Sequence, residues 1–171
     1  MELQQHFEEV RGLIRTGQSR ALKAAYTEQL SVYWQVGAYL HHRLETAEWG
    51  EKVVDQLATW LKEKEPSLKG FNRRSIYRMR EFYLVWHRLD WDALRRDGIA
   101  VSVSPQLEKA DSQSNIIVAS VTPQFKEINN TLSSLTWTHH VEILTRTSSL
   151  EEKVFYLLLS MPPFNQSFWA S

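Results

Sequence analysis

The stretch from Lys69 to Tyr83 reads KGFNRRSIYRMREFY and predicts a helix with two unlike faces. Ile76, Met79 and Tyr83 recur at helical spacing. At about 100° per residue they fall on one arc, which the following Trp86 extends. Arginine side chains occupy much of the remaining circumference. We therefore predict that this helix buries its apolar arc in a core and keeps a basic face outside.

The same segment is where the chain concentrates positive charge. The full sequence of 171 residues carries 20 Lys and Arg against 20 Asp and Glu. Between Lys69 and Arg88, however, six residues are Lys or Arg, and Glu81 is the only carboxylate. Asn72 suits the N-cap position, so we place this helix from Asn72 to about Leu89. Any nucleic-acid binding by such a neutral protein must use a local patch of this kind.

Apolar residues at helical spacing elsewhere predict an all-α domain. Besides the basic helix, the predicted helices span residues 2 to about 15, Ser19 to about Thr46, 51 to about 64, Trp137 to about Arg146, and Ser149 to about Leu158. A break at Thr16–Ser19 separates the first two, and Gly37 in the second is expected to admit a neighbouring helix closely. The pattern of Ser149 and Glu152 predicts a capping box.

Residues 97–132 interrupt this helical pattern. They are rich in Ser, Thr, Asn, Val and Gln and show no helical period. We expect them to form a long irregular insertion, which is unusual in a compact domain. The predicted organisation is one helical domain over residues 1–160 and an unstructured tail at 161–171.

The composition argues against several classes of function. The chain has no Cys, which removes disulfides, thiolate nucleophiles and cysteine zinc sites and suits a reducing cytosol. It shows neither a signal-peptide pattern nor an apolar run of about 18 residues, so we expect a cytoplasmic protein with no membrane partner. The adjacent histidines at 41–42 and 139–140 cannot chelate a metal alone, and Glu151-x-Lys153 lacks the partner carboxylate of a nuclease motif. We expect no catalytic residue, no metal and no cofactor.

The basic face favours a phosphate ligand. Arginine presents a planar fork to two phosphate oxygens, and a helix N-terminus adds N–H donors and positive dipole. Two helices, the second one basic, outline a helix-turn-helix, although the connection from Glu65 to Phe71 is longer than the usual turn. The residues expected to contact duplex DNA, mainly at phosphates, are Lys69, Asn72, Arg73, Arg74, Tyr77, Arg78 and Arg80. A solvated basic face that serves solubility is the competing interpretation.

Aromatic side chains have two possible uses, core packing and base stacking. Most of them, including Trp34, Trp60 and Tyr83, lie on apolar stripes and are assigned to the core. Tyr77 and Trp91 fall outside these stripes and are the candidates for another role.

Several blocks resemble the N-terminal domain of the YhcG-like family of bacterial proteins. The blocks read YWQVG from Tyr33, WGEKVV from Trp49, KGFNRRSIYRMREFY from Lys69, LTWTHHVEIL from Leu135 and EEKVFY from Glu151. Family members carry this domain, of unknown function, before a predicted PD-(D/E)XK nuclease domain. The resemblance implies an all-α domain with a helix-turn-helix or winged-helix-like part that binds DNA beside the nuclease, in restriction or mobile-element systems.

The sequence departs from the family pattern after Ser160. There the family continues into a basic segment and the nuclease, whereas this chain continues with MPPF and ends soon afterwards. We therefore expect a truncated or stand-alone N-terminal domain without nuclease activity. One alternative is a protein-interaction module that docks a nuclease or a restriction-system protein through its helical surface and the Trp137–His140 block. A degenerate fragment without function is the third interpretation.

Overall fold

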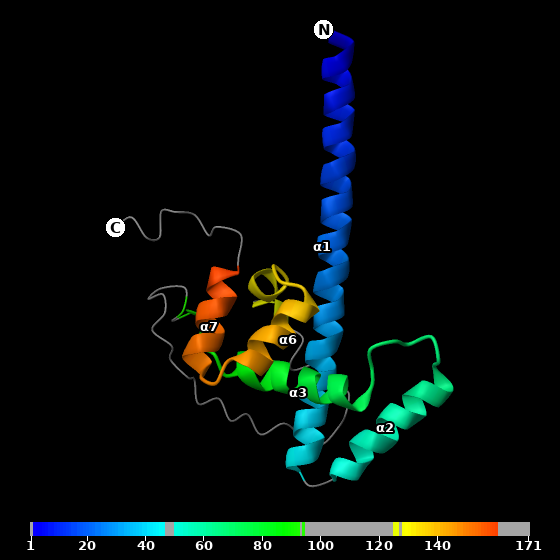
Figure 1. The fold of residues 1–171 in the computed structure, drawn as a ribbon, viewed down its shortest axis with the longest axis vertical. Coiled ribbons are helices and arrows are strands. Elements are labelled where there is room, and N and C mark those ends of the chain that lie inside the picture. The colour runs from blue at the N-terminus through cyan, green and yellow to red at the C-terminus, as the bar shows by residue number, and fades with distance from the viewer. Residues whose placement is uncertain (1, 47–49, 93, 95–124, 127, 161–171) are drawn as a thin grey trace.

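The computed structural model describes residues 2–46, 50–92, 94, 125–126 and 128–160, and the regular structure within them is helix without strands. The labelled helices are α1 (Glu2–Glu45), α2 (Glu51–Lys64), α3 (Arg73–His87), α6 (Trp137–Arg146) and α7 (Leu150–Leu159). Figure 1 shows α3 crossing the C-terminal half of α1, with α2 on one side and α6 and α7 on the other. The predicted all-α class is confirmed, whereas the winged-helix-like detail stays a prediction.

α1 is one continuous helix where the sequence predicted two. The expected break at Thr16–Ser19 is wrong, because the helix passes through it without interruption. A single Gly costs a helix only about 1 kcal/mol relative to Ala, and this stretch contains no Pro. Four weak helix formers between strongly helical flanks are therefore too few to end it. The N-terminal half of α1 extends away from the rest of the molecule (Figure 1).

α3 lies at the centre of the core. It buries the predicted face, Ile76, Met79, Tyr83 and Trp86, and also Phe82. The indole of Trp34 on α1 meets two of these rings edge to face, with centroids 6.0 Å from Phe82 and 5.0 Å from Tyr83. Phe82 lies outside the predicted arc because it packs on the other side of α3, against Trp137 of α6.

Gly37 sets how closely α1 and α3 approach. A Cβ atom at this position would lie 2.2 Å from the carbonyl oxygen of Met79 and 2.9 Å from the Cβ of Tyr83. Both distances are shorter than van der Waals contact, and the first obstacle is backbone, which cannot rotate away. The expected role of Gly37 in admitting a neighbouring helix is confirmed.

Part of the expected irregular insertion is helical and buried. Residues 125–126 and 128–132 are helical, and Phe125, Ile128 and Leu132 are buried in the main core. The prediction of an insertion up to residue 132 is therefore wrong at its end, where these apolar residues have helical spacing. The expectations for residues 97–124, except 94 before them, and for the tail at 161–171 lie outside the described residues.

Two aromatic assignments also change. Trp91 is buried, and its Nε1–H donates a 3.0 Å hydrogen bond to the carbonyl of Trp86, so it belongs to the core. Trp60 on α2 is 53% exposed rather than buried. Tyr77 is half-buried. Sequence periodicity alone placed Trp60 on an apolar stripe, but α2 buries little beyond Val54.

The turn between α6 and α7 is held by capping contacts. The N–H of Glu152 donates to Ser149 Oγ at 3.1 Å, and the N–H of Ser148 donates to the Glu152 carboxylate at 2.8 Å. The buried Lys153 donates from Nζ to the carbonyl of Thr147, the C-cap of α6, at 2.7 Å. The predicted capping box is thus present, with Ser148 supplying the reciprocal N–H.

His140 joins α6 to the core. Its Nε2–H donates a 2.8 Å hydrogen bond to the carbonyl of Leu132, which fixes the tautomer, and its ring lies 4.9 Å from that of Phe82. Burial lowers the pKa of His140 to about 4, because the charged imidazolium would lose its hydration. The residue is therefore a neutral core histidine at physiological pH.

Candidate nucleic-acid interface

The basic face of α3 begins at a sharply bent connection. Gly70 has a positive φ of 93°, a conformation that other residues rarely adopt. Two residues later, Asn72 caps the helix: its Oδ1 accepts a 3.0 Å hydrogen bond from the N–H of Ser75. Asn72 thereby positions the first turn of α3, and its side-chain oxygen is committed to the helix.

Arg73 is held in place by α2 and by its own helix. Its Nε forms an ion pair with Oδ1 of Asp55, and its guanidinium carbon lies 5.2 Å from the ring centroid of Tyr77. Both side chains of the ion pair are more than half exposed, at 58% and 52%. Exposed pairs contribute only about 0–1 kcal/mol, so a phosphate can compete for Arg73.

Tyr77 lies under Arg73 rather than on the open surface. It packs against the cluster formed by Leu40, Val54 and Ile76, where α1, α2 and α3 meet. Its hydroxyl is buried and has no hydrogen-bond partner among the described residues. This position favours a packing role for Tyr77 and leaves little of its ring open to a base.

The structure groups some of the predicted contact residues and separates others. Lys69 and Arg74 are exposed beside Arg73 at the N-terminal end of α3, and Arg78 is half-buried one turn further on. Arg80 is half-buried on another flank, about 160° around the helix from Arg78. Its Nε is buried without a hydrogen-bond partner. The compact group is therefore Lys69, Arg73, Arg74 and Arg78, which we call the basic end of α3.

The histidines next to Arg80 add no charge to this surface. Burial lowers the pKa of His41 to about 4 and outweighs the opposing effect of Glu45, while the charges of His87 and Arg80 lower it further. The ring of His87 stacks on Tyr83 at 4.3 Å, and burial lowers its pKa as well. Both imidazoles are neutral at pH 7, so the positive charge of this region comes from Lys and Arg.

The first turn of α3 has an unusual charge. Arg73 and Arg74 occupy it, and it contains no acidic residue. The N-terminus of a helix carries a partial positive charge, so cations there oppose the helix dipole. An anion bound at the same place would meet two guanidinium groups, the dipole and the N–H groups of the first turn.

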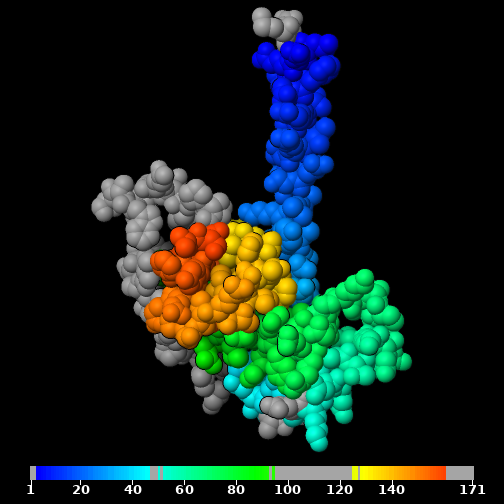
Figure 2. Space-filling model, viewed as in Figure 1, coloured from blue at the N-terminus to red at the C-terminus, as the bar shows by residue number. Residues whose placement is uncertain are grey.

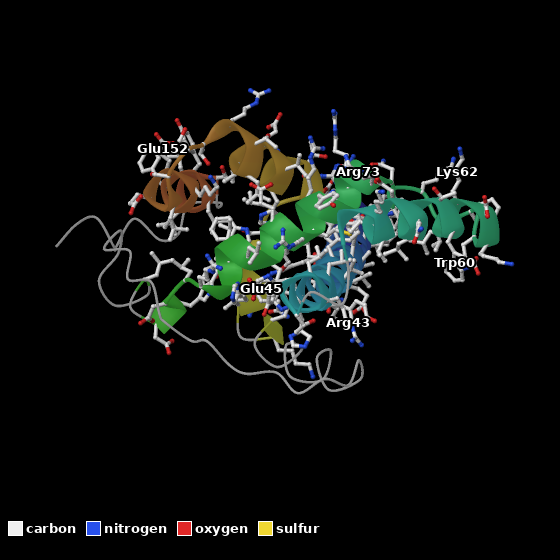
Figure 3. The ribbon with its side chains drawn as sticks, turned by 90° about the horizontal axis from the view of Figure 1, so that it is seen from below. Arg43, Glu45, Trp60, Lys62, Arg73 and Glu152 are labelled. Carbon is white, nitrogen blue, oxygen red and sulfur yellow. The ribbon has the colours of Figure 1, made fainter. Side chains whose placement is uncertain are left out.

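The sequence analysis missed the basic residues of α2. Lys62 and Lys64 lie in the last turn of that helix and are exposed. Figure 3 shows Lys62 on the same side of the molecule as Arg73, with Trp60 on the other. The run KEKE hides them in the sequence, because alternating Lys and Glu sum to no charge. Lysines near a helix C-terminus also favour its dipole, which explains them without any ligand.

The alternative docking block at Trp137–His140 is mostly internal. Trp137 is half-buried, with its ring 4.5 Å from that of Tyr33, and His140 is fully buried. Beside it, a shallow hollow of about 330 Å³ lies between α6 and α7 and is lined by His139, Glu142, Ile143, Arg146, Thr147, Tyr156 and Ser160. Within the described ranges, no three His, Asp or Glu side chains gather as metal ligands. None of the helices described is both long and apolar enough to cross a membrane.

Comparison with known proteins gives one match. The family model described as the DUF1016 N-terminal domain matches residues 9–162, which is most of the chain. No curated protein and no solved structure matches the sequence. The matched range contains all the described helices except the first turns of α1.

Proposed function

Since the chain belongs to the YhcG-like family through its DUF1016 N-terminal domain, we propose that it binds duplex DNA through the basic end of α3. The observation that carries this proposal is the pair Arg73 and Arg74 in a first turn without acidic residues. Family membership supplies no function by itself, because the domain is defined by sequence alone. The proposal therefore depends on the charge and geometry of α3.

Two uses of these arginines differ in what they cost. A basic face that serves only solubility can lie anywhere on the surface, including a helix C-terminus, where the dipole favours it. At the N-terminus each cation costs roughly 0.3–1 kcal/mol at low ionic strength. A bound phosphate reverses the sign of this interaction. Placement against the dipole thus favours an anionic ligand over a role in solubility.

Phosphates are the expected target within DNA. Arg74 and Lys69 are exposed, and Arg73 is bound only by a weak surface ion pair, so all three can reach a polyanion. Contacts of this kind release counterions, which makes affinity fall steeply with salt. Phosphate contacts position a protein on the duplex without reading its sequence.

The test is duplex binding, measured by fluorescence anisotropy against salt concentration. We expect the triple variant Arg73→Ala, Arg74→Ala, Arg78→Ala to bind at least about tenfold more weakly at low salt, since each lost phosphate contact also reduces the salt slope by about 0.9. The control variant removes three exposed basic residues elsewhere and should bind like wild type; it carries Lys52→Ala, Lys126→Ala and Arg146→Ala. Equal binding by the wild type and the first variant would refute the proposal.

A second function is favoured by the surface of α7. Phe155, Tyr156 and Leu159 are exposed there, and the first two rings meet edge to face at 5.4 Å. This surface suits a protein partner, such as a nuclease or a restriction-system protein, better than DNA does. A partner captured equally well by the wild type and by the triple arginine variant, but lost on Phe155→Ala, would support the interaction module.

A further inference from the structure

The N-terminal half of α1 is a bare helix with an apolar stripe. Figure 2 shows it standing clear of the body of the molecule. Leu3, Phe7, Val10 and Ile14 are each more than half exposed. A surface helix normally turns such a stripe toward a core. Here the described part of the chain offers no core to residues 3–16, all of which are exposed.

The stripe has the spacing of a coiled coil. Leu3, Phe7, Val10 and Ile14 alternate by four, three and four residues, and Gly17, Ala21 and Ala24 continue the same alternation. This heptad pattern extends over three repeats and is typical of a helix paired with another helix. Its first half is built of large side chains and its second half of small ones.

The stripe also faces away from the body. Along an ideal helix, Phe7, Ile14 and Ala21 lie roughly half a turn around α1 from Tyr33 and Gly37, which face the core. A second helix can therefore lie along the stripe without meeting α3 or α6 of the same molecule. The extended position of this half of α1 leaves its whole length accessible (Figure 1).

We propose that this stripe binds a second copy of the chain as an antiparallel two-helix pair centred near Gly12. Reversing one helix places Leu3 opposite Ala21 of the second copy, Phe7 opposite Gly17, and Val10 opposite Ile14. Each large side chain then fills the space above a small one, and every heptad position finds its partner. The two bodies lie at opposite ends of the pair, where they do not collide.

Charge complementarity selects this orientation over a parallel one. Residues 2–10 contain three Glu and no Lys or Arg, whereas residues 11–23 contain four Lys or Arg and no carboxylate. An antiparallel pair brings the acidic block of each copy beside the basic block of the other. A parallel pair would align like charges and would also set Gly17 against Gly17 and Ala21 against Ala21, which leaves gaps. Unlike charges at the flanks of a coiled coil set its orientation.

Sedimentation velocity over a range of concentrations tests the association. We expect wild type to form a reversible dimer and Phe7→Glu to weaken it at least tenfold. The matched control is Leu22→Glu, which replaces an equally exposed side chain on a different side of α1 and should leave the dimer unchanged. A wild type that stays monomeric at millimolar concentration, or a Phe7→Glu variant that dimerises normally, would overturn the proposal.

Cross-linking tests the orientation, and the natural absence of Cys makes it clean. Under mild oxidation, a mixture of Leu3→Cys and Ala21→Cys proteins should give a covalent heterodimer. Leu3→Cys alone should give none, because the two copies of residue 3 lie about 27 Å apart in an antiparallel pair. A homodimer of Leu3→Cys would indicate parallel helices and overturn the proposal. None of these variants touches the basic end of α3, so the outcome is independent of DNA binding.

Discussion

The N-termini of α3 and α7 are built alike in their caps and oppositely in their charge. Each begins with a side chain that accepts a hydrogen bond from a backbone N–H three residues later, Asn72 in α3 and Ser149 in α7. The first turn of α7 then carries Glu151 and Glu152, and that of α3 carries two arginines. The dipole stabilises the first arrangement and opposes the second.

The difference separates stability from function. In α7 the carboxylates and the cap stabilise the helix together, and the Glu151 pKa is lowered by hydrogen bonds to its own N–H and to Ser149. In α3 the cap holds a turn whose charges work against it. The inner face of α3 compensates, because its five buried side chains anchor the helix in the core. The outer face is thereby left able to carry charge for a ligand.

The largest expected effect comes from breaking the seat of α3 on α1. Gly37→Ala gains about 1 kcal/mol in helix propensity. The added Cβ would meet the Met79 carbonyl, so the two helices must separate, at a cost of about 3 kcal/mol or more. We expect a clearly lower melting temperature. Gly12→Ala, in open space on the same helix, should raise it slightly; equal shifts in the two variants would contradict the close approach.

Acid should weaken the packing of α3 against α6. The pKa of His140 is about 4 in the folded protein and about 6.5 when unfolded, so the unfolded state binds a proton first as the pH falls. The contribution is complete above pH 6.5 and is lost down to about pH 4, by up to about 3 kcal/mol. Urea unfolding of His140→Gln, which keeps a donor for Leu132, should depend less on pH over this range.

The exposed neighbour gives the control for that measurement. His139→Gln should keep the wild-type pH dependence, because His139 lies in solvent. His41 and His87 also have lowered pKa values and should supply the slope that remains in His140→Gln. Identical pH profiles for wild type and His140→Gln would show that this histidine is not buried in its neutral form.

Removing either cap should have a smaller and similar effect. Asn72→Ala and Ser149→Ala each delete one hydrogen bond to a first-turn N–H, which typically costs about 1 kcal/mol. Chemical denaturation of both variants checks this. Only Asn72→Ala should also weaken DNA binding, since it loosens the turn that carries Arg73 and Arg74. A loss of DNA binding on Ser149→Ala would place the ligand elsewhere.

Local periodicity predicted those features that depend on one helix at a time. The buried face of α3, the caps at Asn72 and Ser149, and the closeness required at Gly37 all follow from residues within a few turns. Features that depend on a distant partner were not predictable. Whether residues 16–19 break a helix, and whether Phe125 enters the core, depends on packing elsewhere in the chain.

The candidate site follows the same division. Sequence alone identified the basic helix and separated its charged face from its buried one. It could not show that Asp55 pairs with Arg73, that Arg80 turns toward His41, or that Lys62 lies on the side of Arg73, because these relations join different helices.

The most direct test of the account reverses one charge in the first turn of α3. Arg74→Glu should stabilise the helix by roughly 0.3–1 kcal/mol, because it places an anion at the positive end of the dipole. The same change should weaken duplex binding at least about tenfold, since repulsion replaces a phosphate contact. Melting temperature and DNA affinity measured on one preparation should thus move in opposite directions. Unchanged affinity in a more stable variant would contradict a DNA-binding role for the basic end of α3.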